Sequence, residues 1–179
     1  KGDALAALLR DAVRLHQAGE SERAQALYAR ILKLAPDQPD ALHLSGLLRY
    51  QAGALAEAEA LIRRALSSNP RTASYHNSLG VVALAQGRAE QARAHFAAAL
   101  ALDPAYAQAL NNLGNALQTL GHLDEAVTAY QRALALKPAD AETHGNLGRA
   151  LQALNRPAEA AEAFRRALAL KPTSATAKR

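Results

Sequence analysis

Amide side chains are concentrated in one short stretch of the sequence. They recur at intervals of three and four residues, at Gln108, Asn111, Asn112, Asn115 and Gln118. This spacing predicts a row along one face of a helix. Each amide carries both hydrogen-bond donors and an acceptor, so such a row can bind the backbone of an extended peptide whatever the side chains of that peptide are.

Equivalent positions elsewhere in the chain extend the row. Asn146 follows it, and Asn77 and Ser78 precede it. A solvated helix face is the plain alternative to a binding surface. Against that alternative, asparagine is up to about 0.7 kcal/mol per residue less favourable than alanine in a helix, although the chain uses alanine freely elsewhere. We therefore predict that these amides bind a ligand.

The corresponding positions in the N-terminal half are apolar. They are Leu9, Val13, Leu44, Leu47, Tyr50, Val81 and Leu84. Exposed apolar surface of this extent marks contact sites in proteins, and we expect the region of Leu44, Leu47 and Tyr50 to receive apolar side chains of a ligand. Two alternatives stay open, which are tighter closure of the helix array and contact with a segment N-terminal to the sequence.

The sequence contains no pattern typical of a catalytic or metal site. Its six histidines do not pair at metal-ligand spacing, and His76 and His144, which occupy equivalent positions, are interpreted as packing residues. Cysteine, glycine-rich phosphate loops and nucleophile motifs are absent. We predict no enzyme activity, no cofactor and no metal.

The net charge of +5 does not indicate a nucleic-acid-binding surface. A basic binding surface concentrates its charge on one face, whereas Arg63 and Arg166 have Glu59 and Glu162 nearby. No apolar run reaches the roughly 18 residues that span a bilayer. We expect a protein or peptide ligand, no nucleic acid, no membrane and a cytoplasmic location, although a chain without cysteine suits the periplasm equally well.

The residues above belong to elements that recur every 34 residues. Prolines mark this period at Pro36, Pro70, Pro104, Pro138 and Pro172. Three further columns keep the same phase: Gly46, Gly80, Gly114 and Gly148; Ala24, Ala58, Ala92, Ala126 and Ala160; Tyr28, Ile62, Phe96, Tyr130 and Phe164. We predict one elongated domain over residues 1–179, with repeats at 5–38, 39–72, 73–106, 107–140 and 141–174.

Each repeat is predicted to hold two helices. In the fourth repeat the first helix covers residues 107–120 and ends at Gly121, because a glycine just past a helix adopts the left-handed conformation without strain. Gly114 on the first helix is predicted to cross closely against Ala126 on the second, since neither residue is bulky. Tyr130 would fill the space beside that crossing.

A 34-residue period with a Leu-Gly pair, an alanine, an aromatic residue and a proline resembles the tetratricopeptide repeat, from Leu5 to Ser174. The resemblance implies an all-α, right-handed superhelical α-solenoid, whose first helices line a concave groove that binds peptides or partner helices. The asparagine row is similar to the groove of O-linked N-acetylglucosamine transferases and their bacterial relatives. The lysine-lined groove of chaperone-binding relatives is not matched, since no predicted first helix carries a lysine.

These features favour a protein–protein interaction scaffold that binds an extended peptide or partner segment in its groove. The alternative is the substrate-recruiting arm of a larger glycosyltransferase or sulfotransferase. The absence of methionine at position 1 favours excision from a longer chain.

Both ends depart from the repeat pattern. Asp11 and Ala12 replace the Leu-Gly pair in the first repeat, which we expect to cap the array. Asn155 replaces the turn glycine of the fifth repeat and is the next-best residue for a left-handed cap.

The segment after Pro172 is too short for a closing helix. We therefore expect a stripe on the last helix that includes Ala163, Ala167 and Leu170 to remain uncovered. Such a stripe would promote end-to-end self-association.

Overall fold

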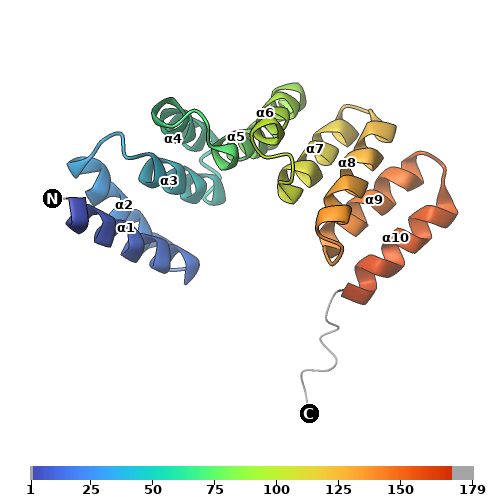
Figure 1. Cartoon of the computed structure of the whole chain (residues 1–179), viewed down its shortest axis with the longest axis horizontal. Helices are drawn as coiled ribbons and strands as arrows, with labels where there is room; N and C mark the ends of the chain where they lie inside the picture. Colours follow the sequence, from blue (N-terminus) through green and yellow to red (C-terminus); the bar gives the residue numbers. More distant parts are fainter. Residues whose placement is uncertain (1, 171–179) are drawn as a thin grey trace, which may run out of the picture. The chain divides into compact units, whose positions relative to one another are not determined.

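The computed structural model describes residues 2–170, which form ten α-helices and no strand (Figure 1). The predicted all-α fold of helical repeats is thus confirmed. The helices belong to two compact units, Lys1–Gln86 and Gly87–Arg179. That residues 1–179 act as one domain stays a prediction.

Unit 1 holds the first five helices. They are α1 (Gly2–Gln17), α2 (Ser21–Leu34), α3 (Pro39–Gln51), α4 (Leu55–Ser68) and α5 (Ala73–Ala85). α1 packs on α2 and α3 on α4 as helical hairpins, while α2 also contacts α3 and α4 contacts α5. Tyr28 and Ile31 lie in one buried cluster, and Ile62 and Leu79 lie in a second. Successive hairpins therefore share an apolar interior.

Unit 2 repeats the arrangement. Its helices are α6 (Ala89–Leu102), α7 (Ala107–Thr119), α8 (Leu123–Leu136), α9 (Ala141–Ala153) and α10 (Pro157–Leu170). The hairpins are α7 with α8 and α9 with α10, and α8 also packs on α9. Their core includes Leu117, Tyr130 and Leu151.

The predicted turn residues have the left-handed backbone that ends a first helix. Gly121 has a φ of 81°, and Asn155, which replaces glycine in the fifth repeat, has a φ of 56°. Asparagine tolerates this conformation better than most residues. The prediction that this turn survives the substitution is confirmed.

The nearest neighbour of Gly114 on the second helix of its repeat is the ring of Tyr130. A Cβ atom at Gly114 would lie 2.7 Å from Cδ1 of the Tyr130 ring, so Tyr130 fills the space beside this glycine as predicted, and the close crossing against Ala126 stays a prediction. The same relation joins Gly148 to Phe164, where a Cβ atom would lie 2.7 Å from Cε1. The glycine column therefore makes room for the large residue of the second helix.

The uncovered stripe predicted on α10 is wrong for two of its three residues. Ala163 and Ala167 are buried, and Ala163 belongs to the core cluster of unit 2. Leu170 is 37% exposed. The prediction about the segment after Pro172 falls outside the described residues, and self-association stays a prediction.

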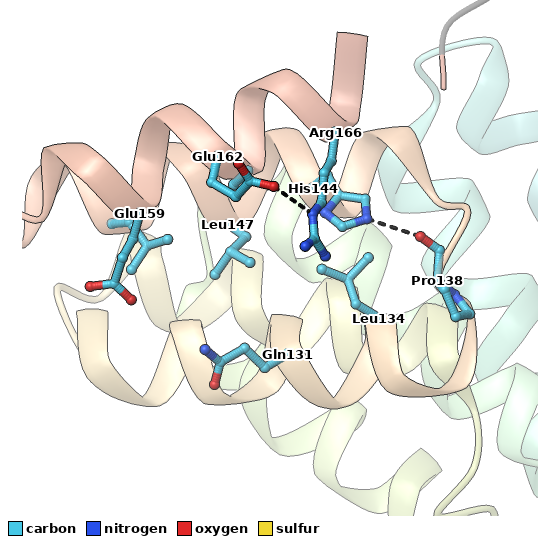
Figure 2. A pocket seen from close by; sticks show the side chains of 10 residues that line it. Gln131, Leu134, Pro138, His144, Leu147, Glu159, Glu162 and Arg166 are labelled. Atoms are coloured by element: carbon cyan, nitrogen blue, oxygen red, sulfur yellow. Dashed lines mark hydrogen bonds and ion pairs between the residues drawn. The ribbon is translucent and has the colours of Figure 1, made fainter. Parts of the chain in front are cut away.

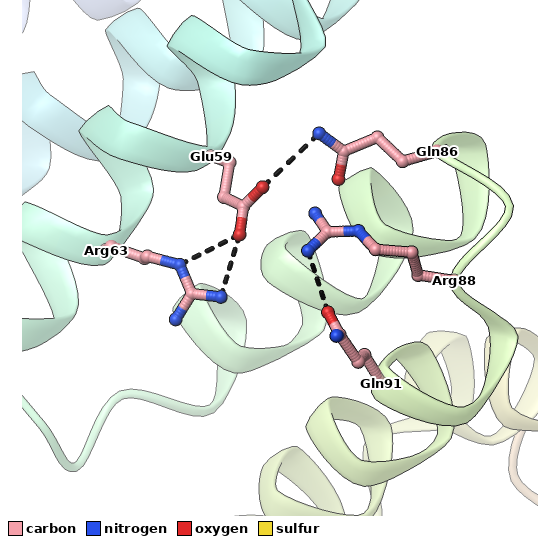
Figure 3. A network of polar contacts seen from close by, with 5 residues as sticks. All are labelled: Glu59, Arg63, Gln86, Arg88 and Gln91. Carbon is pink, nitrogen blue, oxygen red and sulfur yellow. Dashed lines mark hydrogen bonds and ion pairs between the residues drawn. The ribbon is translucent and has the colours of Figure 1, made fainter.

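Arginines on the second helices are paired with glutamates, as predicted. Arg63 donates to Glu59 at 2.7 Å and Arg166 donates to Glu162 at 3.0 Å. Figure 3 shows that Glu59 also accepts a hydrogen bond from Gln86 at 3.3 Å. Because these pairs are solvent-exposed, each contributes at most about 1 kcal/mol. None of the helices within residues 2–170 has both the length and the apolar character needed to cross a membrane.

Candidate peptide-binding surface

The predicted site residues lie on the first helices of the repeats. Leu44, Leu47 and Tyr50 are on α3, and Asn77 and Ser78 are on α5. The amide row is on α7, and Asn146 is on α9. First helices of successive repeats contact each other within each unit, α3 with α5 and α7 with α9.

Two of the amides bond to each other instead of facing solvent. Asn146 Nδ2 donates to Asn111 Oδ1 at 2.9 Å, and the two residues are only 4% and 6% exposed. The Arg149 guanidinium donates to the Asn146 oxygen. Asn111 and Asn146 thus join α7 to α9.

Unit 1 has the same bridge with different residues. His43 Nε2 on α3 lies 2.8 Å from Ser78 Oγ on α5. The His43 ring also packs against Tyr75, with ring centroids 4.5 Å apart, and the Tyr75 hydroxyl donates to Asp40 at 2.7 Å. Burial lowers the pKa of His43 to about 4, although the nearby Asp40 carboxylate opposes the shift. A neutral imidazole therefore fills the position that Asn111 fills in unit 2.

The expected solvent-facing row is accordingly wrong at four positions, because Asn77, Ser78, Asn111 and Asn146 are buried. Whether any of them contacts a ligand stays a prediction. Both bridges join residues 35 positions apart. Aligning residues 34 positions apart pairs equivalent positions of neighbouring repeats. It therefore does not reveal a contact between residues 35 positions apart.

Asn115 and Gln118 bind a hydroxyl group within their own repeat. The single hydrogen of the Tyr130 hydroxyl is shared between Asn115 Oδ1, at 2.8 Å, and Gln118 Oε1, at 3.0 Å. In the first repeat Tyr28 hydrogen-bonds to His16 in the same way, at 3.2 Å. Burial raises the pKa of Tyr130. The oxygens of these two amides are thus used within the fold, and their NH₂ groups are the donors that a ligand could use.

Gln108 and Asn112 line an open hollow of about 290 Å³. Asn111, Lys137, Asp140 and Glu142 complete its lining. Asp140 is held in place because its carboxylate accepts bonds from the Glu142 amide at 3.2 Å and the Thr143 hydroxyl at 2.8 Å, at the N-terminus of α9. The hollow combines amide groups with one ammonium group and two carboxylates, which suits a peptide.

Sequence reasoning missed three of these residues. Lys137 directly follows α8, whereas the lysine comparison with chaperone-binding relatives concerned first helices only. Asp140 lies in the connection that follows. Glu142 lies 34 residues after Gln108 and occupies the same repeat position. A comparison of that position among the repeats could have identified Glu142 as a candidate site residue.

The apolar residues of unit 1 are half-buried. Leu44 packs against the cluster that contains Tyr28, and Tyr50 packs against the cluster that contains Ile62. Leu47 has a similar intermediate exposure. Leu44 and Tyr50 therefore contribute to the core, and all three side chains are partly exposed.

His144 and His76 each hydrogen-bond to a backbone carbonyl of a repeat proline. In the hollow of about 450 Å³ shown in Figure 2, His144 donates to the Pro138 carbonyl at 2.9 Å. His76 makes the equivalent bond to the Pro70 carbonyl at 3.3 Å. Within residues 2–170 no three histidine or carboxylate side chains are grouped as metal ligands.

Three sequence profiles described as tetratricopeptide repeats match residues 15–80, 71–139 and 111–175. The chain belongs to the tetratricopeptide-repeat family. The helical hairpins, the proline column and the glycine turns are the tetratricopeptide-repeat features of this chain. No curated protein matches its sequence.

Solved structures similar to this tetratricopeptide-repeat chain share its fold. PilF of Pseudomonas aeruginosa has a TM-score of 0.87 at 21% identity, covering 98% of this chain and 81% of PilF. MamA from Desulfovibrio magneticus RS-1 has a TM-score of 0.79 at 24% identity, covering 93% and 94%. YrrB, described as a TPR protein with an unusual peptide-binding site, has a TM-score of 0.72 at 23% identity, covering 94% and 87%.

Replacing Asn146 with alanine is expected to destabilise unit 2. The change leaves the buried Asn111 oxygen without its donor, and an unsatisfied buried group costs about 1–3 kcal/mol. Urea denaturation would measure the loss, with the exposed Gln152→Ala on the same helix as the control. Equal midpoints for the two variants would show that the bridge contributes nothing to stability.

Proposed function

We propose that this chain is an interaction scaffold that binds an extended peptide along the first helices of its repeats. The hollow beside α7 and α9 supports this most directly, because the exposed side chains of Gln108, Lys137 and Glu142 surround it. Amides bind peptide backbone, and the two opposite charges bind charged side chains or termini. The likeness to YrrB agrees with a peptide ligand.

In unit 1 the ligand contacts are proposed to be apolar. Leu44, Leu47 and Tyr50 present half-buried side chains whose remaining edges a ligand can cover. In unit 2 the contacts are polar, from Gln108, Asn112 and the NH₂ groups of Asn115 and Gln118. We therefore propose apolar ligand segments for unit 1 and polar ligand segments for unit 2.

The test uses peptides selected from a random display library against the wild-type chain. Replacing Gln108 and Glu142 together with alanine is expected to weaken binding at least tenfold. One neutral and one charged hydrogen bond contribute together about 2 kcal/mol or more. Isothermal titration calorimetry would measure the affinities.

The control is the double variant Gln131→Ala with Arg132→Ala, two exposed residues of α8 that lie outside this hollow. It should bind like the wild type. Selected peptides whose affinity falls in the control but not in the Gln108 and Glu142 variant would refute the proposed surface.

A further inference from the structure

Another hollow, of about 340 Å³, lies in unit 1 and is lined by residues of α2, α3 and α4. Ala29, Leu32 and Leu61 give it apolar walls, and Gln25 and Ser45 are its polar residues deeper in the protein. None of these residues belongs to the proposed peptide-binding surface. The hollow is thus a separate feature of the chain.

Its polar residues are unusual because they have buried atoms without partners. Ser45 is 1% exposed, yet within the described part of the chain its hydroxyl has no hydrogen-bond partner, and neither has Oε1 of Gln25. Buried polar groups in native proteins are nearly always hydrogen-bonded. Two such atoms at one hollow point to a ligand that can satisfy both.

Comparison among the repeats shows that packing does not require this serine. Leu79, Leu113 and Leu147 occupy the equivalent position in the following repeats. In unit 2 the corresponding hollow has Leu147 and Leu151 in its lining, where unit 1 has Ser45 and Arg49. The serine is therefore particular to the second repeat, whereas the polar residues of the unit 2 hollow, such as Gln131 and Glu159, lie at other positions.

The charges around the hollow cancel. Arg49 Nε lies 3.4 Å from Glu57 Oε2, and both residues line the hollow. A charged ligand would disrupt this pair, whereas a neutral ligand would not. Ser45 can donate to a carbonyl and Gln25 Oε1 can accept from an N–H, which together match a primary carboxamide.

We propose that this hollow binds the carboxamide side chain of a glutamine or asparagine on a protein partner. The carboxamide oxygen accepts from the Ser45 hydroxyl, its NH₂ donates to Gln25, and its short stem lies between Ala29 and Leu61. Because both atoms are covered, the half-buried Gln25 side chain must rotate to admit the ligand and then accept from its NH₂ group.

The test is an NMR titration of the isotope-labelled full chain with propionamide, the isolated side-chain group. Chemical-shift changes should saturate at Gln25 and Ser45, at concentrations at least about fivefold lower than with propionate or propylammonium. Fivefold corresponds to one net hydrogen bond. Equal binding of the charged analogues would overturn the proposal, as would a crystal soaked in propionamide that holds ordered water only.

Two variants and one control complete the test. Ser45→Leu fills the hollow and should abolish propionamide binding while raising the urea midpoint, because leucine removes the unpaired hydroxyl. Ser45→Ala keeps the hollow open and should weaken binding about fivefold, so the proposal stays testable if the leucine variant fails to fold. Leu147→Ala, in the equivalent hollow of unit 2, should leave binding unchanged. Unchanged binding in both Ser45 variants would overturn the proposal.

Discussion

Replacing Gly114 with leucine is expected to lower the free energy of unfolding by about 3 kcal/mol, the upper part of the usual range for overpacking. Even the Cβ atom would lie 2.7 Å from Cδ1 of Tyr130. The ring cannot retreat, because Tyr130 is fully buried and its hydroxyl is held by Asn115 and Gln118. A leucine would therefore force α7 and α8 apart.

Gly145 offers a matched control in the same unit. It also lies within a helix, but nothing is within 4 Å of the Cβ that alanine would add. Gly145→Ala should therefore stabilise the helix by about 0.5–1 kcal/mol. Urea denaturation of both variants would give the two opposite shifts, and equal midpoints for the Gly114 variant and the parent would show that the close approach to Tyr130 does not matter.

Acidification from pH 7 to pH 4 is expected to remove about 3 kcal/mol of stability through His43 alone. Burial lowers the pKa of this imidazole from its ordinary 6.5 to about 4 in the folded chain. Between these values the unfolded chain binds a proton that the folded chain does not, so stability falls as the pH falls. A shift of one pKa unit corresponds to 1.36 kcal/mol. The loss should level off below pH 4, where both states are protonated.

The chain itself supplies the control for this prediction. Replacing His43 and Ser78 together with asparagine would give unit 1 the amide bridge that Asn111 and Asn146 form in unit 2. Denaturation midpoints measured from pH 7 to pH 4 should then decline less steeply than in the parent. The two chains carry the same carboxylates, so the difference reports the imidazole together with its interaction with Asp40. Identical slopes would show that His43 does not titrate with a lowered pKa.

The sequence predicted most of the fold because its repeat signals are local. Gly121 and Asn155 end their first helices with a left-handed residue whatever surrounds them. The large residue of the second helix, such as Tyr130, also kept one place in every period. Periodicity therefore located the helices and the turns. It did not show that the Tyr130 ring is the nearest neighbour of Gly114, because that depends on how far the ring reaches across the hairpin.

The candidate site was harder to predict because exposure depends on the neighbouring repeat. Asn111 and Gln108 look alike in sequence, yet one is buried in a bridge to α9 and the other is exposed. Ser45 stands where later repeats have leucine, but only the three-dimensional structure shows that its hydroxyl is buried without a partner among residues 2–170. Tertiary contacts, and not sequence spacing, decide whether each of these side chains is buried or exposed.

The hydrogen bonds of Tyr130 also limit how such a chain could be rearranged during evolution or by engineering. Recombination at the glycine turn after α7 would separate the Tyr130 hydroxyl from its acceptors, Asn115 and Gln118. Recombination at the proline before α9 would keep that hairpin intact but would separate Asn111 from Asn146. The hairpin that can be exchanged as a module therefore runs from one proline to the next. To restore the bridge, the next hairpin must carry a polar residue 35 positions after the polar residue of the exchanged one, as Asn146 follows Asn111.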